Sequence, residues 1–285
     1  MAIGIDKAAG IGLTHQINEK QKTLSKTHEK LATGKRINHA QDDAAGLAVA
    51  KLLEAMSRGY KADSVNIGDA MSAMNIAEGA TQGISDMLGR MQELSIQASN
   101  DTLNDSDRKN LDTEFQELKK EITRLTSGTQ FNTQDLLTGS SPLSDGTGRF
   151  QVGPNHTNGL GGISANEIGA PESRLTAEQL GLGDLNILSR DGATKSMDSI
   201  NQANKTVIGN REIFGSTYNR LEYAYNNNAN MDINTSAALS LIEDLDLAKG
   251  AMDKARDEIL GQSAILAQRN FQEVSRNSML ALLGS

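Results

Sequence analysis

Cysteine and tryptophan are both absent from this 285-residue chain, and aromatic residues together make up only 3% of it. Without cysteine there is no disulfide, no thiolate nucleophile and no cysteine-based metal site. Large rings dominate the burial energy of compact cores, so their scarcity argues against a thick globular core. The apolar residues are mainly Ala, Leu, Ile and Met, most of which favour helices. The composition therefore predicts a mainly α-helical protein.

Proline is also scarce: there are 3 prolines against 27 glycines, and all three prolines fall between residues 129 and 192. Because proline ends or kinks helices, the rest of the chain is free to form long, uninterrupted ones. The stretch 129–192 is instead rich in glycine, and "GRFQVG" within it has the character of a strand. We expect one or two hairpins there, with a turn at Asp145-Gly146, and a short helical piece at 176–181. No large outer domain has room to form.

Two further features are missing: a long apolar run and a basic cluster. No stretch approaches the roughly 18 apolar residues of a membrane span, and the N-terminus lacks the regions of a secretory signal peptide. The net charge is -8, with a pI of about 5.1. Nucleic-acid binding calls for clustered Lys and Arg. We expect no membrane span and no nucleic-acid partner, and any export must use a different signal.

Helical periodicity fills much of the chain. From about residue 43 to 100, apolar and small residues alternate at spacings of three and four, which is the seam of a coiled coil. The seam positions are Ile67, Ala70, Met74, Ala77, Thr81, Ile84, Leu88, Met91, Ser95 and Ala98. After a polar turn at 100–110, with Asp105, Ser106 or Asp107 as candidate caps, a second seam follows. Its positions are Leu111, Phe115, Leu118, Ile122 and Leu125.

From about residue 194 the helical pattern returns, and a polar interruption is expected at 226–236. The seam positions before the interruption are Phe214, Tyr218, Leu221, Tyr225 and Asn228. Segments from both halves of the chain should then pair, because each carries only one apolar stripe. The predicted fold is a long antiparallel coiled-coil helix bundle, with a short β-hairpin section at its tip.

Both ends of the chain carry thin apolar stripes. The stripe positions are Leu13, Ile17, Leu24 and Leu31 near the N-terminus, and Leu245, Met252, Ile259 and Leu266 near the C-terminus. In an isolated pair of helices, the burial of so narrow a stripe barely offsets the conformational entropy lost when the helices form. We expect both ends to be loose in the free chain and to fold when neighbouring copies supply the missing surface. The expected divisions are 1–40, 41–192, 193–236 and 237–285.

The stretch "LATGKRINHAQDDAAGLAVA" (31–50) predicts a joint between two long helices. Gly34 stands where a helix C-cap glycine belongs, with basic residues around it. Asp42 and Asp43 stand where an N-cap and a first-turn acid belong. A catalytic or metal-binding pair is the weaker interpretation, since adjacent residues on a helix do not face each other. Capping is favoured, together with a contact between copies in which Arg36 or another basic residue meets one of the acids.

These motifs, taken together, resemble those of bacterial flagellins. "LATGKRINHAQDDAAGLAVA", "RMQELSIQASNDT" (90–102), "EITRLTSGTQFNTQDLL" (121–137) and the segment from Ile242 through "AILAQRN" (264–270) are similar to flagellin blocks in the same order. The resemblance covers about residues 1–140 and 190–285. It implies a subunit that self-assembles into the helical flagellar filament for swimming. The terminal segments would form the inner core of the filament and the helical rod the surrounding layer.

The resemblance also implies partners and a location. The family is exported unfolded by the flagellar type III apparatus, so the chain would be secreted to the extracellular filament and would meet an export chaperone, the filament cap and hook-associated proteins. Some flagellins are bound by Toll-like receptor 5 through an Arg, a Leu and a Glu that match Arg90, Leu94 and Glu114. Together with Glu93 and Gln97, these residues are either a receptor site or a polar face that packs against neighbouring subunits.

Three other functions fit the sequence less well. A hook-filament junction protein shares the terminal blocks, and a cytoplasmic coiled-coil scaffold would explain the heptads but not the long motifs. An enzyme lacks a constellation of catalytic residues, and no cofactor is expected. The histidines are far apart and lack metal-ligand spacing; they are His15, His28, His39 and His156. The "GLGG" at 159–162 lacks the Lys-Ser/Thr of a phosphate loop.

Overall fold

The computed structural model describes residues 2–155 and 166–283, with side chains at 11–155, 166–277 and 280. The chain packs as two compact units. The central unit is Met56–Ile233, and the terminal unit combines Met1–Ala55 with Asn234–Ser285. The divisions expected after residues 40 and 236 concern roles in a filament, which a single chain does not test.

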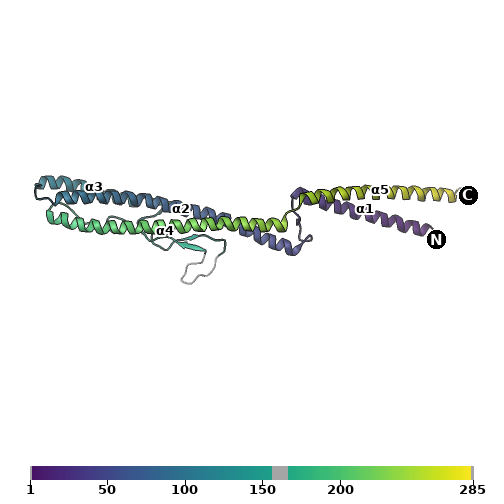
Figure 1. The fold of residues 1–285 in the computed structure, drawn as a ribbon, viewed down its shortest axis with the longest axis horizontal. Helices are drawn as coiled ribbons and strands as arrows, with labels where there is room; N and C mark the ends of the chain where they lie inside the picture. The colour runs from purple at the N-terminus through teal and green to yellow at the C-terminus, as the bar shows by residue number, and fades with distance from the viewer. Residues whose placement is uncertain (1, 156–165, 284–285) are drawn as a thin grey trace. The chain divides into compact units, whose positions relative to one another are not determined.

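Five long helices account for most of the chain, as the composition predicted (Figure 1). They are α1 (Ala2–Thr33), α2 (Ala44–Ala98), α3 (Asp105–Gly128), α4 (Arg190–Glu243) and α5 (Leu247–Leu283). Among the described residues, none of these helices combines the length and apolar character that crossing a membrane requires.

Helices α2 and α4 run antiparallel in the central unit. Ser57 Oγ donates a hydrogen bond to Asp232 Oδ1 at 2.6 Å. Farther along α2, Glu78 forms an ion pair with Arg211 at 3.7 Å. Residue numbers therefore rise along one helix as they fall along the other, which confirms the predicted antiparallel pairing.

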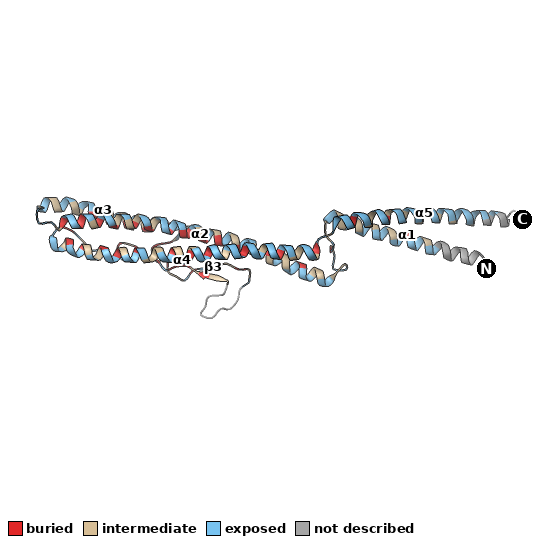
Figure 2. Cartoon of the chain, in the orientation of Figure 1, coloured by how far each residue is buried: buried red, intermediate tan, exposed pale blue. Residues whose placement is uncertain are grey.

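The predicted seam of α2 is the core of the central unit. Every seam position from Ile67 to Ala98 is buried, and Leu94 is buried beside them. Helix α3 lies alongside α2 (Figure 2). Its Phe115 and Ile122 are fully buried and belong to the same core. Alternation of three and four residues thus identified the buried face correctly, because only one face of a helix can follow that spacing.

Helix α4 differs from the prediction at two points. Tyr225 is 44% exposed, and the smaller Ala224 packs against the core in its place. In addition, α4 continues through 226–236 without interruption. Asn228 is buried there, and its Nδ2 donates to Val152 O at 3.0 Å. The asparagines have low helix propensity, but tertiary hydrogen bonds satisfy the polar side chain that faces the core.

Helix α3 begins with a capping box. Asn104 accepts a hydrogen bond from Asp107 N at 2.9 Å, and the Asp107 side chain accepts one from Asn104 N at 3.4 Å. The N-cap is therefore Asn104, one residue before the expected candidates, while Asp107 supplies the reciprocal contact.

The glycine-rich section forms two small antiparallel sheets. β1 (Gln130–Phe131) pairs with β2 (Gln134–Asp135), and β3 (Arg149–Gln151) pairs with β4 (Glu167–Gly169) in the register Phe150↔Ile168. The "GRFQVG" stretch is thus a strand, as expected. Its partner lies after it in the chain rather than across Asp145-Gly146. Residues 176–181 form hydrogen-bonded turns instead of the expected helix.

The hairpin section lies against the flanks of α2 and α4. A Cβ added to Gly59 of α2 would lie 2.5 Å from Pro154 Cβ, so only glycine permits this close approach. The bond from Asn228 to Val152 fixes the same segment to α4. The far end of the bundle is formed by the turn between α2 and α3, and the hairpins fill space along its side (Figure 1).

A buried acid interrupts the seam of α2. Asp63 stands one seam position before Ile67, is 5% exposed, and has an Oδ2 without a hydrogen-bond partner. Burial raises the pKa of Asp63 above its ordinary value of 3.8. The folded chain therefore holds this proton more tightly than the unfolded chain. The stability that Asp63 contributes is full below pH 3.8 and falls as the pH rises through the raised pKa.

Replacing Asp63 with an apolar residue should stabilise the central unit. We expect Asp63→Leu to increase the free energy of unfolding at pH 7 by about 1–3 kcal/mol, because it removes an unpaired buried carboxylate. The gain should shrink as the pH falls through the raised pKa and should be smallest below pH 3.8, where Asp63 is protonated in both states. Urea unfolding followed by circular dichroism at both pH values measures it. Asp69→Asn, on the exposed side of α2, is the control and should change little.

Candidate assembly interface

Two helix breaks meet in the terminal unit. The loop 34–43, between α1 and α2, hydrogen-bonds to the junction between α4 and α5. Leu245 N donates to Gly34 O at 2.8 Å, and Arg36 N donates to Glu243 O at 2.6 Å. Gly34 has a φ of +69°, the left-handed conformation of a C-cap glycine. The sequence therefore predicted the position of the joint. It did not predict that the loop forms backbone hydrogen bonds with the distant junction between α4 and α5.

Side chains of the basic turn reinforce this joint. Lys35 Nζ donates to Glu243 Oε1 at 2.6 Å, and this bond raises the pKa of Lys35. The Glu243 side chain is 8% exposed, so the ion pair is shielded on one side. Arg36 Nη2 donates to Ile242 O at 2.7 Å. Both cations stand at the C-terminal end of α4, where the helix dipole favours positive charge.

The two adjacent acids have separate roles. Asp43 Oδ1 accepts a hydrogen bond from Gly46 N at 2.8 Å and is the N-cap of α2. Asp42 Oδ2 accepts bonds from the backbone N–H groups of His39 and Asn38, which lower its pKa. Asp42 thus closes the loop and is not the N-cap, a position that Asp43 takes instead of standing in the first turn. Arg36 Nη2 lies 3.9 Å from Asp43 Oδ2 within the same chain. The expected contact between copies stays a prediction.

Helix α1 packs against α5 with the face that the sequence predicted. Ile17 is buried, and Leu13, Leu24 and Leu31 are half-buried. A Cβ added to Gly250 would lie 3.0 Å from Leu31 Cδ2, so the two helices approach closely where α5 has no side chain.

Helix α5 turns a different face toward α1 from the one that the sequence suggested. Met252, Ile259 and Leu266 are exposed by 67%, 63% and 58%. The residues on the buried side are mostly small or polar, with Gly250 and Asp257 buried, although Phe271 is half-buried there. Leu245, at the joint, is half-buried. The most apolar stripe of α5 therefore has no partner within the described part of the chain, which the regular heptad spacing could not reveal.

Burial is distributed unevenly between the two units. Among the described residues, the buried apolar side chains of the terminal unit are Ile17, Ile37 and Ala50, while all the others belong to the central unit. Figure 2 shows α1 and α5 largely exposed, with buried positions concentrated along α2 and α4. Hydrophobic burial is the main stabilising term in folding. The terminal unit consequently gains little stability from burial within its own chain and leaves apolar surface that a partner could cover.

The second candidate site comprises Arg90, Glu93, Leu94, Gln97 and Glu114. Four of these side chains reach the surface, and one does not. Arg90 Nε donates to Glu114 Oε1 at 2.8 Å, and its Nη1 donates to Glu93 Oε2 at 2.9 Å. The bond to Glu114 is the main cause of a raised Arg90 pKa. Gln97 is exposed. Leu94, however, is fully buried in the core of the central unit. Its side chain supports the helix packing and offers no contact surface in the folded chain.

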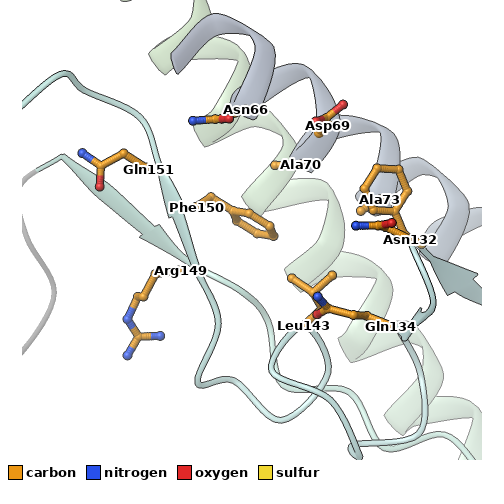
Figure 3. Close-up of a pocket in the computed structure, with 11 residues that line it drawn as sticks. Asn66, Asp69, Ala70, Ala73, Asn132, Gln134, Leu143, Arg149, Phe150 and Gln151 are labelled. Atoms are coloured by element: carbon orange, nitrogen blue, oxygen red, sulfur yellow. The ribbon is translucent and has the colours of Figure 1, made fainter. Parts of the chain in front are cut away.

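A pocket of about 300 Å³ lies between α2 and the hairpins (Figure 3). Ala70 and Ala73 line it together with Phe131 and Phe150, while amide side chains and Asp69 stand around them. The Phe150 ring points toward α2, and Arg149 points away from it. Its titratable side chains are Asp69 and Arg149.

Titratable groups elsewhere are dispersed. Within residues 2–155 and 166–283, no group of three or more His, Cys, Asp or Glu side chains is arranged to hold a metal. His15, His28 and His39 are exposed, as expected, and the last two contact carboxylates of Glu258 and Glu29. His156 and the "GLGG" stretch lie outside the described residues.

Comparison with known families gives two matches along the chain. The bacterial flagellin N-terminal helical region matches residues 8–141, and the bacterial flagellin C-terminal helical region matches residues 197–283. Together they include the joint, most of the central helices and α5.

Two characterised relatives align over most of the chain. A flagellin of Halalkalibacterium halodurans is 38% identical over 258 residues, which cover 90% of each protein. The flagellar filament 30.7 kDa core protein of Treponema maltophilum is 36% identical over 260 residues, covering 86% of this chain and 87% of that protein.

Among solved structures, a putative flagellar hook-associated protein from Vibrio parahaemolyticus has a TM-score of 0.55 over 71% of this chain and 99% of that one. Its identity is only 16%, so it shares the fold alone. The long alignments favour a filament protein over a hook-filament junction protein. The chain belongs to the bacterial flagellin family, whose members are structural proteins of the flagellar filament and not enzymes.

Proposed function

We propose that copies of this flagellin join through their terminal units, and that the exposed stripe of α5 is the docking surface. The single observation that carries the proposal is the exposure of Met252, Ile259 and Leu266 along one face of the helix. Apolar side chains at heptad spacing are suited to knobs-into-holes packing against another helix. A neighbouring copy would supply that helix.

Contacts of this kind join different surfaces on successive copies. Such heterologous contacts do not close on themselves and therefore extend into a helical filament. The terminal unit would gain most of its stability during this step, because its own chain buries so few apolar side chains. Folding of α1 and α5 is thereby coupled to polymerisation. The stripe positions Leu13, Ile17, Leu24 and Leu31 would remain committed to α5 of the same chain.

The setting of this assembly follows from the family. The chain would be exported unfolded by the flagellar type III apparatus, added to an extracellular filament and used for swimming. An export chaperone, the filament cap and hook-associated proteins are the expected partners. The absence of cysteine suits such a route, since a chain without disulfides has none to reduce before threading through a narrow channel.

The central unit supports a second, narrower proposal, recognition by Toll-like receptor 5. The exposed polar cluster of Arg90, Glu93 and Glu114 is preorganised by hydrogen bonds, and Arg is frequent at binding hot spots. With Leu94 buried, these side chains and Gln97 would make the direct contacts. The same face would pack against neighbouring subunits in the filament.

Polar substitution of the stripe should abolish elongation while leaving the monomer folded. The variant Met252→Gln/Ile259→Gln/Leu266→Gln keeps residues that favour helices. Losing three docked apolar side chains at roughly 1.5–3 kcal/mol each should lower the affinity for filament ends by about a thousandfold or more. Sedimentation after seeding measures the polymer.

The matched control for the stripe is Leu260→Gln/Ile265→Gln. These two residues are exposed by 43% and 38% on the same helix but lie outside the stripe. The control should elongate far better than the triple variant. Equal elongation by the triple variant and the unmodified protein would show that the docking surface lies elsewhere.

The joint should depend on its shielded ion pair. Lys35→Met leaves the Glu243 carboxylate without its cation, and backbone hydrogen exchange at Leu245 and Arg36 should accelerate by about tenfold. Nuclear magnetic resonance or mass spectrometry detects the change. Lys51→Met removes an exposed i,i+3 pair with Glu54 and serves as the control. If both variants exchange alike, the Lys35 pair does not hold the joint.

Receptor recognition is tested with monomer on reporter cells. Arg90→Ala should reduce the signal by roughly tenfold or more if Arg90 is an anchor of the contact. Arg124→Ala removes another exposed Arg, which pairs with Glu121 on α3, and should leave the signal unchanged. No signal from the unmodified monomer, or no loss with Arg90→Ala, contradicts this proposal. Leu94→Ala is unsuitable because it would open a cavity in the core.

A further inference from the structure

Helix α5 carries two chemically different faces. Its apolar stripe is Met252, Ile259 and Leu266, and a second stripe at the same heptad interval contains Gly250, Asp257 and Ala264 and ends at Phe271. The second stripe lies toward α1, with Gly250 and Asp257 buried and Ala264 half-buried. Corresponding positions of the two stripes differ by two residues, so the stripes point in directions roughly 160° apart around the helix.

The observed arrangement is not the one that hydrophobicity alone would select. The α1 side of the pair is apolar, with Ile17 at its centre and leucines above and below. Rotation of α5 about its axis would bring Met252, Ile259 and Leu266 against that side and bury more apolar surface within a single chain. The same rotation would remove the surface on which a second copy docks. A specific interaction must therefore favour the observed rotational state.

Polar contacts between the two helices mark this state. Lys20 Nζ lies 3.7 Å from Asp257 Oδ1, and Gln268 Nε2 donates to Thr14 Oγ1 at 3.2 Å. The Asp257 side chain is only 11% exposed, whereas that of Lys20 is 41% exposed. In the rotated state Lys20 would face the apolar stripe and lose its carboxylate partner. A buried or half-buried charge without its partner is strongly unfavourable.

We propose that the Lys20–Asp257 pair sets the rotational state of α5 and so reserves its apolar stripe for a second copy of the chain. The inference rests on the proposed docking role of that stripe. A single polar position within an apolar seam is known to fix the register and pairing of coiled coils at a cost in stability. Here the polar pair fixes which face of one helix meets its intramolecular partner.

The chain offers a direct readout of this state, because it contains no cysteine of its own. Gln16 and Ala264 line the same groove between α1 and α5. The pair Gln16→Cys/Ala264→Cys therefore reports the observed state, and Gln16→Cys/Leu266→Cys reports the rotated one. A short thiol-specific cross-linker applied to dilute monomer should join the first pair and leave the second largely unjoined.

Charge reversal at Lys20 should change this result. In Lys20→Glu the two acids repel each other, so Asp257 turns toward solvent and the apolar stripe turns toward α1. We expect the ratio of the second cross-link to the first to rise by about tenfold. A fully buried charge would give a larger rise, but Lys20 is partly exposed. Elongation from seeds should fall in parallel. Lys22→Glu makes the same charge change at an exposed position of α1 and should alter neither measurement.

The exchanged pair Lys20→Glu/Asp257→Lys should restore both the first cross-link and elongation. Failure of this rescue, or equal behaviour of Lys20→Glu and Lys22→Glu, overturns the inference. Absence of the first cross-link in an otherwise unmodified chain overturns it as well. Failure of the docking proposal is distinguishable, because it appears as normal elongation of the Gln-substituted stripe variant, whatever the cross-links show.

Discussion

The terminal unit cannot bury its own apolar surface, and the rest of the molecule is organised around that constraint. The central unit has a continuous core, in which Leu88, Phe115 and Phe214 are almost completely shielded from water. The terminal unit has three buried apolar side chains among its described residues and an exposed stripe along α5. A protein that assembles without limit needs this division. One part must be stable before assembly, and another must be completed by a neighbour.

Polar interactions have different roles in the two units. In the central unit they satisfy individual buried groups, as Asn228 does with Val152. In the terminal unit they determine how the chain is arranged. Lys35 and Arg36 hold the two helix breaks together, and Lys20 faces Asp257 across the helix pair. Where apolar burial is scarce, a few charged contacts have a larger share in selecting one arrangement among several.

Much of the helical architecture was predictable, because a seam with spacing three and four is geometrically restrictive. Ile67 through Ala98 obeyed it throughout, and Gly34 and Asp43 marked the ends of helices as their chemistry suggests. The sequence predicted which helix faces are apolar more reliably than it predicted what each of those faces packs against. The stripe containing Ile259 was recognised correctly as apolar, but the heptad could not tell whether it faced its own chain. The burial of Leu94 could not be foreseen for a related reason, since a motif position carries no information about burial.

The joint has one further consequence, which concerns mechanical load. Backbone bonds from Leu245 to Gly34 and from Arg36 to Glu243 connect the two chain segments at the point where each helix breaks. A tensile or twisting force applied to either terminal helix is thus shared by both segments, and neither loop can stretch alone before these bonds rupture. The two connections therefore bear load together.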